Sequence, residues 1–344
     1  MRTFLLLTSL SVTTVVSAQV SQLPQSRTLL LEEFTAINCG NCPAGHVISN
    51  GIISAHPDDA VLVNIHAGSL AVPSAVQPDF RNTFGTQIHS NYGISFTPQA
   101  LLNRRPYNGA TALSSGNWVN ASSAVLALPS PVNLAATTDY DNATRELTVH
   151  VEYYYTGYSP GGDDRIMVLL TEDHLNAYQQ NYGVGGPYAN YDHRHLLRSY
   201  ITALAGDPIT STSSGSTEVR TYSYTVPAGF NTDNCRVVAF VAEGATSGFG
   251  EVYQVITAPA VGTSAGVDDV TREHTLRIYP LPANDAVNVL LLPSSEARRL
   301  MLTDAGGRSV ATMNVPAGVG SLSLPTAGLP NGMYLIAIEG FRPQ

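Results

Sequence analysis

The sequence contains no lysine, and this absence excludes several kinds of chemistry. Schiff-base enzymes need a lysine amine, and the P-loop of nucleotide-binding proteins needs a lysine that contacts phosphate. All 17 basic residues are therefore arginines, and against 26 acidic residues they leave a formal net charge of -9. Because nucleic-acid binding requires a basic face toward the phosphates, we expect no nucleic-acid partner.

Cysteine is also scarce, with three residues among 344. Cys39 and Cys42 form a Cys-Gly-Asn-Cys motif, and Cys235 stands alone. A structural zinc site normally takes four ligands, and the sequence has no second closely spaced pair, so we expect neither a metal nor a cofactor here. Spacing alone leaves two roles open for the pair, a thiol–disulfide couple or a structural disulfide.

Charged side chains make up only 12% of the sequence and hydrophobic ones 44%, a balance that excludes a disordered chain. Residues 1–18 predict a secretory signal peptide, because Arg2 and an apolar run precede the small-residue cleavage site that ends at Ala18. Neither this run nor any later one reaches the roughly 20 apolar residues of a transmembrane helix. We therefore expect a protein without a transmembrane helix that works outside the cytosol.

The rest of the chain divides into three predicted domains. Residues 19–128 alternate strand-like and helix-like patterns, which indicates an α/β domain. Residues 129–262 contain β-rich runs separated by Asn, Asp and Gly, and they predict a β-sandwich. A small-residue linker at 263–271 leads to an all-β module at 272–344. The predicted fold class is α+β, in a multidomain chain.

The cysteine pair lies between a predicted strand, Thr28–Ala36, and a predicted helix, Ala44–Ala55. The amino end of a helix stabilises a thiolate and would lower the pKa of Cys39. The thiol of Cys42 would then be placed to resolve a mixed disulfide. The placement suits thiol–disulfide exchange, although pKa and exposure, which separate a reactive pair from a structural one, do not follow from spacing.

The segment Glu33–Pro43 resembles the active-site strand and loop of thioredoxin-like proteins, and Tyr92–Pro98 resembles the cis-proline loop of that superfamily. The motifs Leu-Glu-Glu-Phe-Thr-Ala and Cys-Gly-Asn-Cys-Pro-Ala-Gly-His are similar to a narrower group, the Omp28-related outer membrane proteins of Bacteroidetes. This resemblance spans residues 27–258. It implies that the α/β domain is thioredoxin-like and is joined to a β domain.

The resemblance also implies roles for individual residues. Cys39 would attack, Cys42 would resolve, Glu33 would assist proton transfer as a buried acid, and Pro98 would shape a groove for protein clients with thiols or disulfides. Two departures from the thioredoxin pattern keep an alternative open: Asn38 replaces the usual Trp, and no Lys accompanies the acid. The alternative is a non-enzymatic cell-surface binding or structural protein, in which the pair is a stable bridge.

A histidine pair, His193 and His195, is a weaker candidate site. Residues two apart on a strand share a face, so the pair could hold a metal if His174 supplied a third ligand. The alternative, which we favour, is a hydrogen-bonded pair that orders the Gly- and Tyr-rich loop at 183–191.

Two further side chains bear on the cysteine chemistry. Cys235 opens an apolar strand-like run, and we predict a buried free cysteine because Cys behaves as a small hydrophobe. His46 follows Cys42 by about one helical turn and could tune its thiolate. We nevertheless expect His46 to occupy a solvated position on the helix.

The module at 272–344 resembles the sorting domain of proteins exported by the type IX secretion system. Three blocks carry the resemblance in the family order, and they begin at Leu276, Leu302 and Leu329. The resemblance implies a partner in the type IX machinery and a protein that is secreted, at the cell surface or outer-membrane-associated after periplasmic transit. Only twelve residues follow Gly332, fewer than the family pattern, so we expect a truncated module.

Overall fold

The computed structural model describes residues 20–244, 250–261, 276–279, 286–291, 297–304, 308–330, 332 and 334–339. The predicted signal peptide at 1–18 and the linker at 263–271 lie outside these residues and stay predictions. The chain forms two units, residues 1–264 and 265–344, and each is described by itself.

The first unit is built around β1 (Leu29–Thr35), a strand buried along its whole length. β1 pairs in parallel with β2 (Ala60–His66) and antiparallel with β3 (Gln99–Leu102). β3 in turn pairs with the short β4 (Leu113–Ser114). The apolar run at the start of β1 suits a strand that is covered on both faces.

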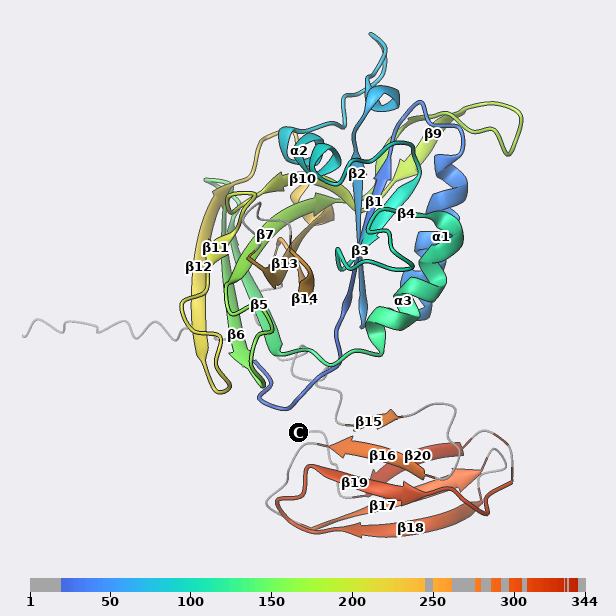
Figure 1. Ribbon diagram of the computed structural model, residues 1–344, viewed down its shortest axis with the longest axis vertical. Coiled ribbons are helices and arrows are strands. Elements are labelled where there is room, and N and C mark those ends of the chain that lie inside the picture. Colours follow the sequence, from blue (N-terminus) through green and yellow to red (C-terminus); the bar gives the residue numbers. More distant parts are fainter. Residues whose placement is uncertain are drawn as a thin grey trace, which may run out of the picture. The chain divides into compact units, whose positions relative to one another are not determined.

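Three α-helices cover this part of the sheet (Figure 1). They are α1 (Cys42–Ala55), α2 (Thr83–Asn91) and α3 (Trp118–Leu126). α1 joins β1 to β2 and lies beside α3 on one face, whereas α2 lies on the other face. Pro43 stands in the first turn of α1, where its missing N–H costs no helical hydrogen bond.

Successive residues of β1 enter two different cores, because neighbouring side chains of a strand point to opposite faces. Leu29 and Leu31 pack with Trp118 beneath α1 and α3. Leu30 packs with Ile88 of α2 in the core of the other face. This alternation decides the environment of every polar residue on the strand.

The sheet continues beyond β2 into the segment that was predicted as a separate β domain. Its described strands have the order β14-β13-β7-β10-β2-β1-β3-β4, with β11 (Asp207–Pro208) beside β7. The added strands are β7 (Asp164–Glu172), β10 (Leu196–Tyr200), β13 (Cys235–Glu243) and β14 (Val252–Pro259).

The predicted separation of 19–128 from 129–262 therefore differs from the structure. The two segments join where β10 pairs in parallel with β2, at Leu196 and Asn64. The physical reason is that β7 and β13 are apolar on both faces and need cover on both, as a strand at the centre of a fold does. One of their faces contributes to the same core as β1, so a boundary at 128 would expose it.

A second sheet covers the other face of β7 and β13. It consists of β5 (Val132–Asp141), β6 (Glu146–Tyr155) and β12 (Thr217–Thr225), in the antiparallel order β12-β6-β5. Buried residues alternate along β6, and Val149 and Val151 pack into the shared core. The predicted β-rich character of this region is therefore present, as one layer against the large sheet.

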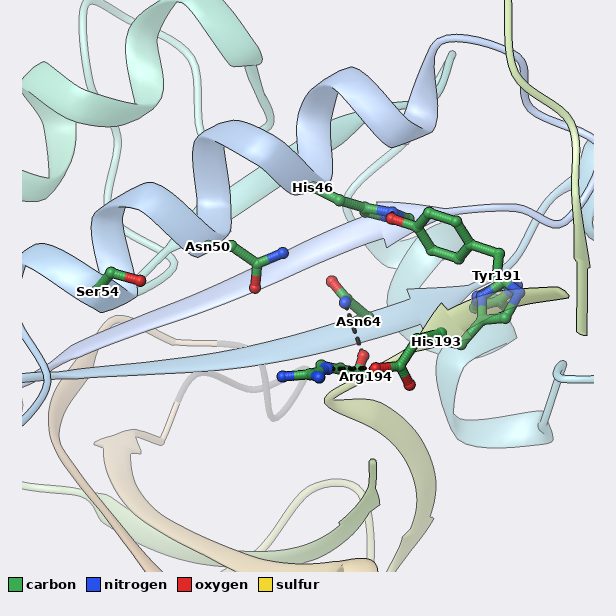
Figure 2. A pocket seen from close by; sticks show the side chains of 9 residues that line it. His46, Asn50, Ser54, Asn64, Tyr191, His193 and Arg194 are labelled. Atoms are coloured by element: carbon green, nitrogen blue, oxygen red, sulfur yellow. Dashed lines mark hydrogen bonds and ion pairs between the residues drawn. The ribbon is translucent and has the colours of Figure 1, made fainter. Parts of the chain in front are cut away.

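A hairpin of β8 (Leu175–Gln179) and β9 (Tyr188–His193) lies between β7 and β10 in the sequence. The hairpin sits beside the start of α1, and Tyr191 of β9 faces His46 of that helix (Figure 2). The predicted loop at 183–191 thus becomes a shorter loop that ends where β9 begins.

The described residues of the second unit form two small antiparallel sheets, with the orders β15-β16-β19 and β18-β17-β20. Val289 and Leu324 of one sheet share a core with Leu300 and Leu302 of the other, so the predicted all-β module is observed. The strands are β15 (Leu276–Tyr279), β16 (Ala286–Leu291), β17 (Arg298–Asp304), β18 (Ser309–Val315), β19 (Ser321–Pro325) and β20 (Tyr334–Glu339).

The architecture is a mixed α/β fold with one large sheet and few helices, followed by C-terminal strands. Within the described part of the chain, no helix is both long and apolar enough to cross a membrane.

Candidate functional site

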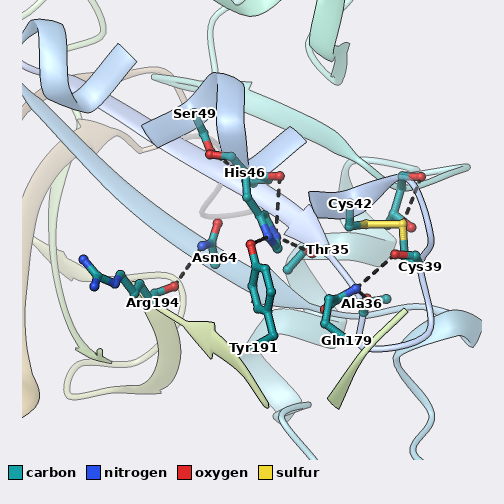
Figure 3. A network of polar contacts seen from close by, with 12 residues as sticks. Thr35, Ala36, Cys39, Cys42, His46, Ser49, Asn64, Gln179, Tyr191 and Arg194 are labelled. Atoms are coloured by element: carbon teal, nitrogen blue, oxygen red, sulfur yellow. Dashed lines mark hydrogen bonds and ion pairs between the residues drawn. A yellow bond between two sulfur atoms is a disulfide. The ribbon is translucent and has the colours of Figure 1, made fainter. Parts of the chain in front are cut away.

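Cys39 and Cys42 form a disulfide between the end of β1 and the start of α1 (Figure 3). Their Cα atoms are 5.4 Å apart, and the turn that joins them includes a hydrogen bond of 3.4 Å from the Cys42 N–H to the Cys39 carbonyl. Cys39 is only 2% exposed and Cys42 is fully buried. The bridge is therefore shielded from solvent in this oxidised form.

The side chain of Gln179, at the end of β8, braces the cysteine turn. Its amide nitrogen donates hydrogen bonds to the carbonyl oxygens of Ala36 and Cys39, at 3.1 and 3.0 Å. Gln179 is itself fully buried. Each of these carbonyl oxygens also accepts a main-chain N–H, from Cys39 and Cys42 respectively, so the hairpin supplies a second hydrogen bond to both.

The loop that follows Gln179 covers the turn. The main-chain N–H groups of Gln180 and Tyr182 donate to the carbonyls of Ile37 and Gly40, both at 2.9 Å. The ring of Tyr182 lies so close to Gly40 that a Cβ at this glycine would approach it to 2.5 Å. Gly40 is therefore required by the close approach of the covering loop.

Glu33 lies on the face of β1 that points toward α1, and its side chain is fully buried. Burial raises the pKa of Glu33 to about 8, so the carboxyl group carries a proton at neutral pH. Ser49 donates a hydrogen bond of 2.6 Å to Oε2. Oε1 has no hydrogen-bond partner among the described residues. Glu33 is therefore a buried, protonated acid with one oxygen unpaired within the described part of the chain.

Gly45 brings Glu33 and Pro98 together at the first turn of α1. A Cβ at Gly45 would lie 2.7 Å from Oε1 of Glu33 and 2.9 Å from Cβ of Pro98. The Thr97–Pro98 peptide bond is cis, and the Thr97 carbonyl oxygen lies 3.5 Å from Sγ of Cys39. The four residues that the sequence singled out for exchange chemistry therefore meet around one helical turn.

His46 is not solvated, as the sequence predicted, but buried at 5% exposure. Its Nε2 lies 2.8 Å from the Thr35 hydroxyl and 3.8 Å from Oε1 of Glu33. Its Nδ1 lies 2.7 Å from the hydroxyl of Tyr191. The prediction was wrong because β9, which is distant in sequence, covers this face of α1.

Three buried histidines, His46, His66 and His193, lie near one another. The rings of His66 and His193 have centroids 5.4 Å apart, and Phe80 packs against both. Burial is the main cause that lowers the pKa of His46 to about 3 and that of His193 to about 4, and it holds the pKa of His66 well below its usual value. All three imidazoles are therefore neutral at physiological pH.

A pocket of about 330 Å³ opens between α1, β2 and the end of β9 (Figure 2). Sequence reasoning singled out His46 and His193 but not Asn50, Ser54 or Asn64, which line the pocket from α1 and β2. A signal was available, because Asn64 and His66 interrupt an otherwise apolar strand, and buried polar residues in such a strand need a purpose. The lining residues are His46, Asn50, Ser54, Asn64, His66, Tyr191, Asp192, His193 and Arg194.

The predicted metal candidates do not come together. β9 ends at His193, so His195 does not share its strand, and His195 instead lies 3.5 Å from the carboxylate of Asp173. His174 pairs with Asp192 at 3.2 Å. Across the described ranges, no group of three or more His, Cys, Asp or Glu could hold a metal ion.

Cys235 is a buried free cysteine at the start of β13, as predicted. Burial raises the pKa of its thiol to about 12, so it stays a neutral thiol at physiological pH. Its neighbours are core residues such as Val237 and Tyr253. Cys235 therefore acts as part of the core.

Comparison with known proteins places these observations in a family. The model of the family "Outer membrane protein Omp28" matches residues 85–264, more than half of the chain, and the model "Secretion system C-terminal sorting domain" matches residues 277–342. No curated protein matches the chain.

Two solved structures from Porphyromonas gingivalis resemble this one. The match to HBP35 covers 91% of this chain and 98% of HBP35, with 15% sequence identity and a TM-score of 0.55. At this identity the match shows a likeness of fold alone. The match to a domain of the outer membrane lipoprotein Omp28 covers 38% of this chain and 89% of that domain, with 21% sequence identity and a TM-score of 0.27.

The sorting domain implies export with the type IX secretion machinery, in agreement with a secreted or cell-surface protein. The expected relationship, drawn from the motifs around the cysteine pair and from the C-terminal blocks, is confirmed by both family models. This chain belongs to the Omp28 family of outer membrane proteins and carries a type IX C-terminal sorting domain.

Proposed function

We propose that this protein is an exported thiol–disulfide exchange protein of the thioredoxin-like type, with Cys39 and Cys42 as its reactive couple. One observation carries the proposal: a CxxC disulfide, a buried protonated acid and a cis-proline meet at the first turn of one helix. The order of β1, α1 and β2 around the motif, with β1 and β2 parallel, supports it as well.

The disulfide would react by accepting two electrons from a client dithiol. A client thiolate attacks Sγ of Cys39 and breaks the bridge, and Cys42 leaves as a thiolate that takes the proton of Glu33. The second client thiolate then attacks the client sulfur of the mixed disulfide, and Cys39 leaves as a thiolate. The two protons released when the client thiols ionise protonate Cys39 and restore the proton of Glu33, so the client gains a disulfide and the protein becomes a dithiol. The reverse sequence reduces a client disulfide.

The surroundings of the pair suit these steps. The amino end of α1 stabilises negative charge on a departing thiolate. Glu33 lies against Gly45, in the same helical turn as Cys42, and its pKa of about 8 keeps a proton available at neutral pH. Pro98 and the Thr97 carbonyl, which approaches Cys39, form the wall along which a client would lie.

Exchange requires the covering loop at 180–187 to move, because both cysteines are buried. The loop is held by the Gln179 amide and by the main-chain bonds of Gln180 and Tyr182. The side chain of Tyr182 is 67% exposed, so the cover is a thin layer with little apolar burial of its own. Such segments open at a low cost compared with a core strand.

The burial of both sulfurs favours a second candidate function. In this alternative the bridge is structural, the hairpin is a permanent cover, and the protein is a non-enzymatic cell-surface binding or structural protein. A buried disulfide would resist reduction when the hairpin covers it and Gln179 holds the main-chain carbonyl groups of the cysteine turn.

The reduction potential of the pair separates the two functions. It would be measured on the mature protein by equilibration with glutathione or dithiothreitol buffers, followed by mass-tagging of free thiols. In the variant Cys235→Ala, Cys39 and Cys42 supply the thiols that the mass tag counts. The variant Cys39→Ser lacks the couple and gives the baseline for exchange activity. A potential between about -270 and about -120 mV supports exchange, whereas a value below about -300 mV assigns a structural bridge and overturns the proposal.

A further inference from the structure

The pocket between α1, β2 and β9 contains polar groups that the exchange reaction does not use. Asn50 and Ser54 project from α1 on one side, and Asn64 and Arg194 lie opposite (Figure 2). In Figure 3, His46 and Tyr191 separate Asn64 from the disulfide. The pocket is therefore a distinct hollow next to the cysteine site.

Two side chains that line the pocket are more than nine-tenths buried and keep an unpaired polar atom. Asn64 is 6% exposed, and its Nδ2 donates to the Arg194 carbonyl at 2.8 Å. Its Oδ1 points the other way, toward Asn50 (Figure 2), and has no partner in the part of the chain that the structure describes. His66 is 3% exposed, and its Nδ1 is likewise without a partner among those residues. Buried polar atoms nearly always have a hydrogen-bond partner.

A third unpaired atom, Oδ1 of Asp192, has the same chemistry as the Asn64 oxygen. The other carboxylate oxygen of Asp192 accepts from Nε of Arg194 at 2.7 Å and lies 3.2 Å from Nδ1 of His174. Oδ1 itself is buried and unpartnered within the described ranges. An amide oxygen and a carboxylate oxygen can only accept hydrogen bonds, so a ligand at these atoms must donate them.

The charge of the pocket selects a neutral ligand. The carboxylate of Asp192 is balanced by the guanidinium of Arg194. The imidazoles of His46, His66 and His193 are neutral, because burial lowers the pKa of each. A charged ligand would lose water here without meeting an unbalanced opposite charge, and this desolvation is costly.

The size and the rings of the pocket restrict the ligand further. A volume of about 330 Å³ is at the small end of ligand sites and suits a single six-membered ring with its substituents. The rings of Tyr191 and His193, whose centroids are 5.0 Å apart, supply apolar surface for C–H groups. A molecule with several hydroxyl donors and a C–H face matches both features.

We propose that this pocket binds a neutral, polyhydroxylated molecule of monosaccharide size, with Oδ1 of Asn64 and Oδ1 of Asp192 accepting hydrogen bonds from its hydroxyl groups. Arg194, Asn50 and Ser54 provide the donors that the oxygens of such a ligand need. The site is independent of the proposed exchange reaction, since it involves neither cysteine.

The probes for the test are D-glucose, D-galactose, D-mannose and N-acetyl-D-glucosamine, titrated into the full chain with binding followed by saturation-transfer NMR. Ethylammonium and acetate, which are smaller and each carry C–H protons that this measurement can detect, serve as the charged probes. We expect saturable binding of at least one sugar and no saturable binding of either charged probe. Binding only by a charged probe, or by none of the six, overturns the proposal.

A pair of variants locates the site. Asn50 is an exposed helical residue at the pocket, so Asn50→Trp fills the hollow without altering the core. Asn120→Trp makes the same change at an exposed position of α3 and is the matched control. We expect Asn50→Trp to weaken sugar binding at least about tenfold and Asn120→Trp to leave it unchanged. Equal binding by both variants overturns the proposal.

A cysteine variant separates this site from the exchange reaction. Cys39→Ser abolishes the redox couple and leaves every lining residue of the pocket in place. We expect it to bind the sugar with the affinity of the unaltered chain. Loss of binding in Cys39→Ser, with the fold intact by circular dichroism, would contradict an independent pocket, whatever the reduction potential proves to be.

Discussion

Glu32 and Glu33 are neighbours on β1, and because they point to opposite faces of the sheet their carboxyl groups enter different surroundings. Both are fully or almost fully buried. Glu32 accepts two hydrogen bonds of 2.8 Å from the guanidinium group of Arg104. Among the described residues, Glu33 has only the Ser49 hydroxyl as a hydrogen-bond partner, on one oxygen, and His46 lies 3.8 Å from the other oxygen. Burial alone does not determine the surroundings of a carboxyl group, because the hydrogen-bond partners on its own face of the sheet differ from those on the other face.

The largest loss of stability should come from breaking the ion pair between Glu32 and Arg104. Arg104→Met leaves the Glu32 carboxylate buried without its guanidinium, and the loss of one partner of such a pair costs about 3–5 kcal/mol of stability. Urea unfolding of the purified chain measures this loss.

A surface pair supplies the control for that measurement. Arg81→Met removes the bidentate partner of Asp79 at an exposed site, where water replaces the interaction, and it should leave the urea midpoint unchanged within error. If Arg104→Met and Arg81→Met shift the midpoint equally, the buried pair is not what holds this face of β1.

The next effect concerns the close contact on the Glu33 face. Gly45→Ala places a methyl group 2.7 Å from Oε1 of Glu33, and such overpacking costs about 1–3 kcal/mol. Gly51, on the same helix, has no atom within 4 Å of the position that a Cβ would occupy, so Gly51→Ala should instead stabilise by about 0.5–1 kcal/mol. Thermal or urea unfolding of the two variants gives the comparison, and the same sign for both would refute it.

The charge state of Glu33 gives a pH-dependent effect on stability that is modest over any one pH unit and accumulates across the window between its two pKa values. Burial raises its pKa from 4.5 to about 8, so between these values the folded protein holds a proton that the unfolded chain has released. Stability therefore falls as the pH rises through this window, by up to about 1.4 kcal/mol per pH unit. Glu33→Gln removes the titrating group, and the variant should lose this slope and gain stability relative to the unaltered chain at the alkaline end.

Urea unfolding between about pH 5 and about pH 8 tests that expectation. The glutamine keeps the size of the side chain and can still accept the hydrogen bond from Ser49. Parallel pH profiles for Glu33→Gln and the unaltered chain would show that Glu33 does not hold the extra proton.

The smallest effect should come from the hydroxyl that reaches His46 from β9. Tyr191→Phe removes a contact of 2.7 Å to Nδ1 of His46 and should cost about 1 kcal/mol. Tyr188→Phe, on the same strand, removes a hydroxyl that bonds to none of the described residues and should be neutral. The free energies of unfolding of the two variants decide, and an equal change in both would mean that the contact between the Tyr191 hydroxyl and His46 adds nothing to stability.

Local features of the sequence predicted the elements around the cysteine pair well. The expected strand at Thr28–Ala36 is observed as Leu29–Thr35, and the expected helix at Ala44–Ala55 is observed as Cys42–Ala55. A short apolar run and a proline in the first helical turn act over a few residues, so a single sequence displays them.

Features that depend on distant residues could not be predicted in the same way. The contact between His46 and Tyr191 joins residues 145 positions apart, and the pairing of Leu196 with Asn64 merges the two predicted domains. No periodicity or motif near His46 indicates that β9, a strand so far along the chain, covers it. Its burial, and with it the pocket, became visible only in the folded protein.

The position of the covering hairpin in the chain has a consequence for biosynthesis. Gln179 follows Cys39 by 140 residues, and a polypeptide is made and exported from its amino end. During synthesis the two thiols thus emerge on a still uncovered turn, long before the hairpin that encloses them has been made. Oxidants reach the pair early in the life of the molecule, and reductants reach it late or only through an opening of the cover.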